Sequence, residues 1–522
     1  MRFSVSALSG FQAGSYTLLS AGGGLSSASY RTAGTLPAGY QYSLSIAASS
    51  VALNVGAMTT ANTLYWKGLL SADWTTINET LTASNWATNT AGADFAATPG
   101  AGTTAVFSVT GITGTVLTTS LQSSFSVNDL VFSNQLGSGP MNSITIASGV
   151  GANSLNIAPS SPTVGITLQP GSPSTVILTA PIVLGASQTW SVADSGKSLV
   201  VSGGISGGNN NLTKDGAGTL KILAPSSYSG TTTVSAGVLT IGDGSNVGAS
   251  TGTGPTTVAS GAVLNGGTSV VGSVGGNLAV QTGATFSAGN GSGSAGHGVG
   301  GMQVAGAVTW DAGSNMVFDF SATSGNQTGV EGTAGTNWDW VAITGDLNLA
   351  TSGQKINLYI DSWDGSSGYG QNNNAGNVNE FDPSAPVTGD THGGVAYTYT
   401  WKWLTANSIK IDDVGLNPLN DVNLSDQFNI VTETTDPNVF GNGVFSPGSY
   451  SLPISGGQFW VSARSGGLYI NYSSVPEPSS LLLVSLAGLG LRYCRRKKKL
   501  AADENEVCSQ GDAKTSGLNL PI

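Results

Sequence analysis

The sequence of residues 203–248 is GGISGGNNNLTKDGAGTLKILAPSSYSGTTTVSAGVLTIGDGSNVG. Three steps within it, LTKDGAGTLKI, SYSGTTTV and SAGVLTIG, alternate β-branched residues or leucine with small polar residues. A period of two is typical of a strand that buries one of its faces. The runs are separated by Gly216, Gly218, Gly230 and Gly237. Because glycine adopts a positive φ without strain, we predict short strands joined by tight glycine corners.

The composition extends this prediction to most of the chain. Charged residues make up 9% of the chain and 76 of its 522 residues are glycine, against about 25% and about 7% in average proteins. Apolar residues do not recur at helical spacing before residue 479, which predicts an all-β body. Each unit has too little apolar surface to close a core alone, so neighbouring units must stack.

We therefore predict a right-handed parallel β-solenoid, or β-helix, with an apolar spine inside and Asn or Ser ladders at its corners. Flanking capping strands or β-sandwich-like strands should close its ends. A rung rises about 4.8 Å and takes somewhat over about 20 residues. Residues 100–330 should then form about ten rungs, in a rod roughly 50 Å long.

The same stretch resembles the autotransporter-associated β-strand repeat. That family begins its repeat with Leu-Thr-Lys-x-Gly-x-Gly-Thr-Leu, continues with Tyr-x-Gly-x-Thr and ends with Ala-Gly-x-Leu. The matching residues are Leu212, Thr213, Lys214, Gly216, Gly218, Thr219, Leu220, Tyr228, Gly230, Thr231, Ala236, Gly237 and Leu239. The resemblance implies that looser rungs follow the repeat as far as about residue 475.

Three tryptophans, Trp66, Trp74 and Trp86, lie in a segment that resembles the opening of such proteins. One interpretation makes them a platform on which sugar rings stack, since tryptophan pairs a large apolar face with one polar tip. The other makes them buried caps over the first rung. We favour the caps because the terminal repeat of a solenoid needs covering.

A second pattern lies near the end of the chain, where Pro476, Glu477 and Pro478 precede SSLLLVSLAGLGLRYC. The prolines disfavour helix before Ser479, and the apolar run 479–491 can form a short helix. A cationic cluster follows, made of Arg492, Arg495, Arg496, Lys497, Lys498 and Lys499. By the positive-inside rule this flank stays in the cytoplasm, so the body should lie outside.

This order resembles the PEP-CTERM sorting signal of exopolysaccharide-producing Gram-negative bacteria, which implies processing by a membrane protease of the exosortase type. The alternative is an ordinary tail anchor, which predicts the same topology without processing. The run would make a helix of roughly 20 Å, short of the roughly 30 Å hydrocarbon core, which suits a signal that is cut. Cys494 could be acylated beside the membrane, but we favour an inert thiol.

The predicted organisation has six parts: 1–57, closing strands of a truncated preceding unit; 58–200, the tryptophan-containing opening segment and a β-rich region; 201–330, the repeat solenoid; 331–474, the β-rich C-terminal part of the solenoid; 475–499, the sorting signal with its transmembrane segment; and 500–522, a disordered acidic tail. Its first part contains no secretory signal peptide. The strands YTLLS, YQYSLSI and VALNV there are expected to need a preceding rung to pair against. We expect in-frame coding sequence before Met1, with a decayed gene fragment as the alternative.

Residues with catalytic or metal-binding chemistry are few. His297 and His392 each lie in a glycine-rich turn, where neither a metal nor an acid–base role is expected. The acidic residues of the C-terminal part are Asp361, Asp364, Asp382, Asp390, Asp412 and Asp413. Their spacing fits no known calcium loop, and nothing marks Asp361 and Asp364 as a glycosidase pair. We predict no catalytic residue, no cofactor and no metal.

The formal net charge is −11, and six of the 17 cations lie within residues 492–499. Such a body repels nucleic acid, and it holds no cysteine, since the two cysteines are Cys494 and Cys508. We predict an exported, non-enzymatic cell-surface protein with a structural or adhesive role in the envelope or exopolysaccharide matrix. The predicted partners are the sorting protease, extracellular polysaccharide or other surface proteins, and the membrane. The alternative is a polysaccharide lyase or glycosidase on the same scaffold.

Overall fold

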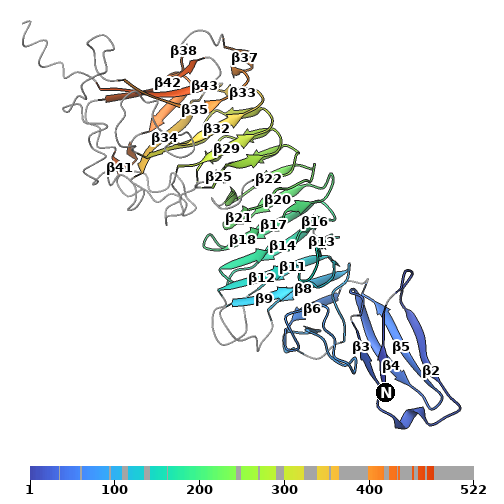
Figure 1. Cartoon of the computed structure of the whole chain (residues 1–522). Helices are drawn as coiled ribbons and strands as arrows, with labels where there is room; N and C mark the ends of the chain where they lie inside the picture. The colour runs from blue at the N-terminus through green and yellow to red at the C-terminus, as the bar shows by residue number, and fades with distance from the viewer. Residues whose placement is uncertain are drawn as a thin grey trace, which may run out of the picture.

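A computed structural model gives the fold of the chain (Figure 1). It describes residues 1–474 apart from 7, 35, 59–61, 93–95, 109–115, 134–141, 161–162, 243–247, 268–270, 290–298, 322–337, 352–353, 364–397, 417–421, 432, 435–449, 452–456 and 465–466. The described residues form strands and one short 3₁₀ helix, η1 (Leu25–Ser27). The predicted all-β class and the parallel β-helix are confirmed. The predicted transmembrane segment lies outside the described residues, and none of the described helices has the length and apolar character needed to cross a membrane.

The β-helix has three faces, and most neighbouring strands within a face come from successive rungs. The first face is a 14-stranded sheet. Its strands are β6 (Asn62–Trp66), β7 (Trp86–Ala87), β8 (Thr103–Phe107), β11 (Asp129–Phe132), β14 (Val164–Leu168), β17 (Gln188–Val192), β20 (Leu212–Asp215), β22 (Thr232–Val234), β24 (Thr256–Val258), β27 (Leu278–Val280), β30 (Val308–Asp311), β33 (Leu347–Ala350), β36 (Ile409–Ile411) and β37 (Val414–Gly415).

The second face is an 11-stranded sheet in which every described pair is parallel. Its strands are β9 (Val116–Ser120), β12 (Ser143–Ala147), β15 (Thr175–Leu178), β18 (Ser198–Val201), β21 (Thr219–Ile222), β23 (Val238–Ile241), β25 (Val263–Gly266), β28 (Thr285–Ser287), β31 (Asn315–Ser321), β34 (Ile356–Trp363) and β39 (Phe428–Val431).

The third face is interrupted in the middle of the rod. Its first part is made of β10 (Phe125–Val127), β13 (Leu155–Ile157), β16 (Ile182–Leu184) and β19 (Ile205–Ser206). Isolated bridges from Ile205 to Ser226 and from Ser250 to Ser273 carry the face across the gap. Its second part is made of β26 (Gly272–Val274), β29 (Gly301–Val304), β32 (Trp340–Ile343), β35 (Thr398–Thr405), β43 (Gly467–Ser474), β42 (Gly457–Arg464) and β38 (Val422–Asn423), the last four joined by antiparallel pairing.

The strands of the first face begin 20 to 35 residues apart from Thr103 to Val308. Nine strands of this face begin within residues 100–330, in agreement with the prediction of about ten rungs. Corner loops between the strands account for the extra length, since the strands themselves stay three to five residues long.

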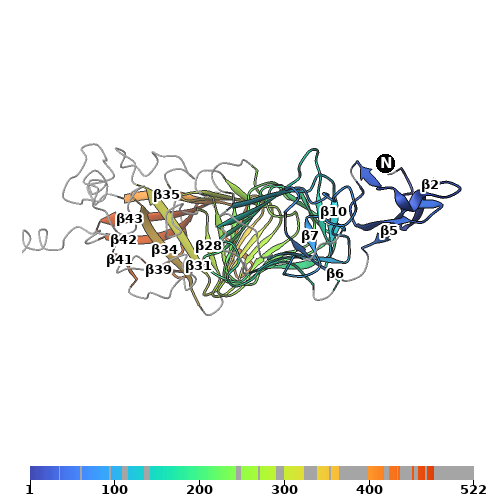
Figure 2. The same cartoon turned by 90° about the horizontal axis from the view of Figure 1, so that it is seen from below.

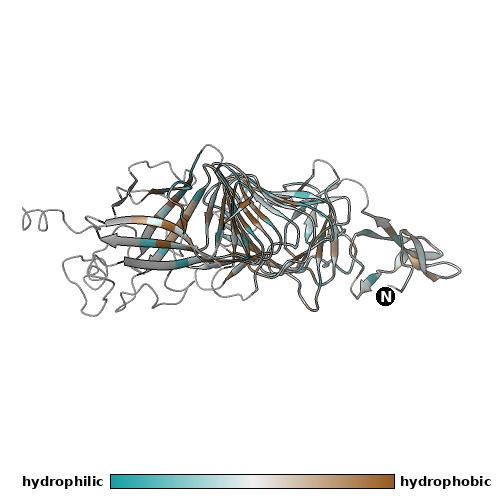
Figure 3. Cartoon of the chain, turned by 90° about the horizontal axis from the view of Figure 1, so that it is seen from above, coloured by the Kyte–Doolittle hydropathy of each residue, from teal (hydrophilic) through white to brown (hydrophobic). Residues whose placement is uncertain are grey.

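The core is a set of straight columns of side chains, because successive rungs pair in register. One column on the second face contains Ile144, Val176, Leu199, Leu220, Leu239, Leu264, Phe286, Met316 and Leu358, each at most 1% exposed. Figure 3 shows apolar positions recurring along the stacked strands. Burying one such side chain contributes about 1.5–3 kcal/mol, so the columns supply the cohesion that no single rung possesses.

An asparagine ladder runs along the second face. The amide of Asn357 donates to Oδ1 of Asn315 at 3.0 Å, and that of Asn429 donates to Oδ1 of Asn357 at 3.0 Å. These residues are also Cα partners in neighbouring strands. The predicted Asn ladder is confirmed, although it lies within strands rather than at a corner.

The tryptophans form the cap at the N-terminal end of the β-helix. Trp66, Trp74 and Trp86 are fully buried, and Trp74 and Trp86 meet edge to face with ring centres 4.9 Å apart. All three rings contact Phe107, whose ring stacks on that of Phe132 in the next rung. The prediction of buried caps is confirmed, and the sugar-platform alternative is wrong because none of these rings reaches the surface.

Beyond this cap lies a small sheet at one end of the molecule (Figure 2). It contains β2 (Gly14–Ser20), β5 (Ser50–Ala57) and β4 (Tyr40–Ile46) in antiparallel order, and β1 (Arg2–Ser4) pairs with β3 (Arg31–Ala33) beside it. The three predicted strands are confirmed. They pair with one another, with β5 in the centre, so the pairing that they were expected to need is supplied within this sheet. The short strands β40 (Glu433–Thr434) and β41 (Tyr450–Ser451) pair with each other.

Only half of the predicted glycine corners depend on a positive φ. Gly216 and Gly237 have φ of 78° and 65°. Gly218 and Gly230 do not, and are required because the neighbouring rung lies against their Cα atoms. A Cβ on Gly230 would lie 2.1 Å from the carbonyl oxygen of Asn210. We expected a positive φ to require glycine at these two positions. Instead, the close approach of the neighbouring backbone excludes a side chain there.

Gly230→Ala should therefore destabilise the β-helix by about 1–3 kcal/mol, the usual cost of overpacking. Gly196→Ala is the matched control, because a Cβ there meets nothing within 4 Å. Urea unfolding followed by circular dichroism measures the difference between the variants. Equal midpoints for the two variants would contradict the close approach.

Candidate functional site

The repeat spans two rungs of the β-helix. Strands β20 and β21 belong to the first rung, and β22 and β23 belong to the second. Leu220 and Leu239 are direct partners across these rungs and are fully buried. The motif therefore encodes one rung-to-rung contact, with its leucines inside.

Tyr228 of the motif lies on the third face, at a level where that face has no regular strand. Tyr228 is fully buried, and its hydroxyl lies 2.7 Å from Oγ1 of Thr232. A Cβ on Gly252 would lie 2.6 Å from the Tyr228 ring, so the next rung lies against the ring. Burial raises the pKa of Tyr228 above its ordinary value. The ring replaces the side chains that a strand supplies elsewhere.

Lys214 is the unexpected member of the motif, because its side chain points into the core and is 0% exposed. Lys214 lies in a column of inward side chains, between Trp190 of the preceding rung and Val234 of the next. Its ammonium donates to the carbonyl oxygens of Asp215 at 2.9 Å, Gly216 at 2.7 Å and Ala236 at 3.0 Å. Since an ammonium has three donors, all of them are used.

These bonds join two rungs, because Asp215 ends β20 and Gly216 follows it, whereas Ala236 lies between β22 and β23 of the next rung. Burial lowers the pKa of Lys214 to about 8, and the charge of Asp215 opposes part of this shift. Sequence analysis placed Lys214 in the motif but missed this role. The available signal was its position in LTKD, where the strand period puts Leu212 and Lys214 on the same face.

A pair of buried acids is a second group that sequence analysis missed. Asp319 in β31 and Asp339 beside β32 are 0% and 1% exposed. Oδ1 of Asp339 accepts the N–H of Gly300 at 2.8 Å, and Oδ2 accepts the N–H of Asp319 at 3.1 Å. Burial, with the nearby Asp319 carboxylate, raises the pKa of Asp339 well above its usual range. The pair ties the chain together where it passes from β31 to β32.

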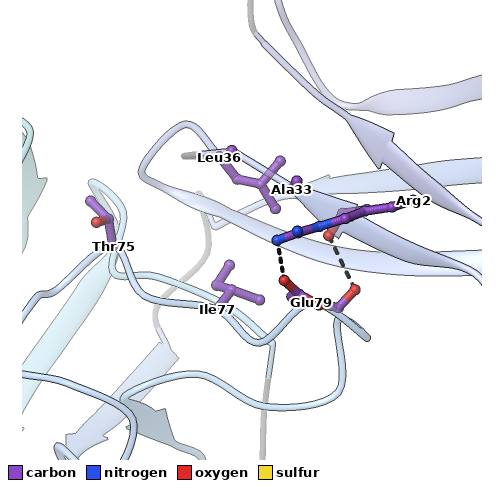
Figure 4. A pocket seen from close by; sticks show the side chains of 8 residues that line it. Arg2, Ala33, Leu36, Thr75, Ile77 and Glu79 are labelled. Atoms are coloured by element: carbon purple, nitrogen blue, oxygen red, sulfur yellow. Dashed lines mark hydrogen bonds and ion pairs between the residues drawn. The ribbon is translucent and has the colours of Figure 1, made fainter.

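A small cavity of about 230 Å³ lies between the N-terminal sheet and the cap (Figure 4). Arg2 and Glu79 form an ion pair at its mouth, and Arg31 lies 3.7 Å from the same carboxylate. Leu36 and Ile77 line its wall. Its charged side chains are paired with one another and exposed, and we assign the cavity no ligand.

The other predicted residues fall into three groups. Asp361 lies in β34, where it is the Cα partner of Asp319. His297, His392, Asp364, Asp382, Asp390, the residues of the sorting signal and both cysteines lie outside the described residues. Asp412 and Asp413 lie in a turn with positive φ, where Asp412 accepts the N–H of Thr351 and Asp413 accepts the amide of Asn348. In the part of the chain that the structure describes, no three acidic, histidine or cysteine side chains gather as a metal site would require.

The pKa of Lys214 predicts a rise in stability with pH. In the folded protein this amine has a pKa of about 8, below its ordinary value of 10.5. Between these two pH values the unfolded chain binds more protons than the folded chain does. The free energy of unfolding therefore increases as the pH rises. From pH 8 to pH 10 the free energy of unfolding should rise by about 2 kcal/mol. Above pH 10 the raised pKa values of Tyr42 and Tyr228 oppose this gain.

Lys214→Met should abolish this slope and lower stability at pH 8, because it leaves three buried carbonyl oxygens without donors. Lys221→Met is the control, since Lys221 lies on the outer face of β21. Urea titrations at several pH values measure both variants. A slope that persists in Lys214→Met would contradict the assignment.

Comparison with known families agrees with this geometry. Residues 212–241 match the passenger-associated-transport-repeat, which spans the two rungs joined by Lys214. Residues 474–498 match the PEP-CTERM protein-sorting motif, which begins at the last residue of β43. A search of curated proteins and a search of solved structures each found no match. The chain thus combines a passenger-associated-transport-repeat with a PEP-CTERM sorting motif, and is an exported, surface-sorted β-repeat protein.

Proposed function

We propose that the protein is a non-enzymatic rod displayed on the cell surface, with a structural or adhesive role in the envelope or the polysaccharide matrix around it. One observation carries the proposal: the sorting motif follows directly from β43, the strand that closes the C-terminal end of the β-helix. A segment that is processed or anchored there holds the rod by one end. The opposite end and the long faces are then free to meet a matrix.

The first face offers a surface suited to many weak contacts. Its strands present a column of partly exposed threonines, made of Thr189, Thr213, Thr233, Thr257 and, after Ala279, Thr309. β-Branched side chains are stiff at χ1, so their hydroxyls keep one spacing along the rod. An uncharged row of hydroxyls fits a neutral polysaccharide, and repetition along the rod raises the overall affinity.

The buried acids support a role without catalysis. General acid–base chemistry requires a carboxyl group within reach of the substrate. The oxygens of Asp339 face backbone N–H groups inside the core instead. Asp319 is equally inaccessible. This pair therefore serves the packing of the rod, and we assign it no catalytic role.

We further propose that the sorting motif is processed by a protease of the exosortase type, and that the apolar run 479–491 spans the membrane once before processing. Pro476→Ala with Pro478→Ala should block processing in a host that carries the protease, because the break before the apolar run is lost. Immunoblots of membrane fractions should then show the full-length chain accumulating. Pro173→Ala in the body is the control. A tail anchor that is not processed would give the same immunoblot pattern for both variants, which would contradict this proposal.

Binding to matrix polysaccharide tests the adhesive role. Thr213→Glu, Thr233→Glu and Thr257→Glu together should weaken retention on immobilised neutral polysaccharide by about tenfold or more, since avidity depends on repeated contacts. The control carries Thr175→Glu, Ser198→Glu and Thr219→Glu, three aligned outward positions on the second face. Unchanged retention of the first variant, with its β-structure intact, would overturn this assignment of the face.

A further inference from the structure

The N-terminal sheet has one open edge, which is β2. Strand β5 pairs with one side of β2, and no described strand pairs with its other side. The opposite edge of the same sheet is covered: the N–H of Tyr42 donates to Ala96 and the N–H of Thr98 donates to Tyr40. An open edge presents a row of backbone donors and acceptors that another strand can bind.

Most of the usual protection against edge pairing is missing from β2. Its sequence GSYTLLS contains neither a charged residue nor proline, and the chain carries no charge between Arg2 and Arg31. A register shift between Thr17 and Leu19 interrupts the regular pairing with β5 in the second half of the strand. The first half, from Gly14 to Thr17, pairs regularly with β5.

The open edge also leaves an aromatic cluster half covered. Tyr16 of β2 stacks on Phe11 with ring centres 5.6 Å apart, and Phe11 meets Tyr40 edge to face at 5.3 Å. Tyr16 remains 36% exposed, whereas Tyr42 in β4, on the far side of β5, is 1% exposed. A further strand placed against β2 would cover the exposed side of Tyr16 and extend the apolar face of the sheet.

The edge is complementary to a second copy of itself. When two β2 strands pair antiparallel about a two-fold axis at Tyr16, Tyr16 lies opposite its own copy and Ser15 lies opposite Thr17. Aromatic pairs and hydroxyl pairs of this kind stabilise antiparallel sheets, and no like charges meet. The same patch then serves both copies, as a two-fold interface requires.

The position of β2 gives this pairing a consequence. Strand β2 lies at the outer end of the N-terminal sheet, whereas β43 lies at the far end of the rod (Figures 1 and 2). We propose that two copies of the chain pair edge to edge through β2, so that two rods join head to head. This inference rests on the proposed surface display, because rods held at their C-terminal ends on facing cells would then adhere to each other.

Two variants that differ only in the sign of one charge test the interface. Ser15 and Thr17 are exposed, so both variants should fold. The full-length S15K/T17K chain places lysine opposite lysine and should be monomeric. The S15K/T17E chain places lysine opposite glutamate and should dimerise as the natural chain does. Sedimentation equilibrium in detergent measures the masses, and S43K/S45K, on exposed positions of β4, is the control.

Each result decides the question. A natural chain that stays monomeric at all concentrations overturns the proposal, as does a dimer that S15K/T17K leaves intact. Cells displaying the natural chain should aggregate, and cells displaying S15K/T17K should not. If external protease cleaves the chain on intact cells but these cells do not aggregate, head-to-head adhesion is overturned and surface display remains supported. Chain that external protease cannot reach would instead defeat the proposed function.

Discussion

The structure depends on parallel pairing between successive rungs, because no rung has a core of its own. Pairing in register places Leu220, Leu239 and Leu264 above one another, so every buried side chain is covered by the rungs beside it. The contact between rungs also restricts which residues can occupy the corners of the chain. Where one rung turns against the next, as at Gly218 and Gly230, backbone atoms leave no space for a Cβ.

The same stacking governs the buried polar groups. A charged or polar group inside the rod must find its partners in its own rung or in an adjacent one, since burial without hydrogen bonds is costly. Lys214 bonds to carbonyl groups of two rungs, and Tyr228 bonds to Thr232 in the following strand. Asp339 accepts N–H groups from Gly300 and Asp319. The bonds from Lys214 to Ala236 and from Gly300 to Asp339 join neighbouring rungs.

The two ends of the rod are closed by different elements. At one end Trp66, Trp74 and Trp86 cover the first rung, and a separate sheet follows with β2 at its free edge. At the other end β35, β43 and β42 turn the third face antiparallel, and the sorting motif begins where β43 ends. The proposed surface display rests on the sorting motif at one end, and the proposed pairing rests on the edge of β2 at the other.

The sequence by itself determined the all-β class, the stacked rungs, the motif at Leu212–Leu239 and the sorting signal, because these follow from local alternation, glycine spacing and charge order. Three features depended on tertiary structure. That Lys214 finds a third carbonyl group, on Ala236, depends on the next rung. Whether Gly230 needs dihedral freedom or space depends on Asn210, 20 residues earlier. That Asp319 and Asp339 share one buried site depends on how β31 and β32 meet. Each involves residues brought together by stacking, and a local pattern records which face a residue occupies but not which atoms of the neighbouring rung lie against it.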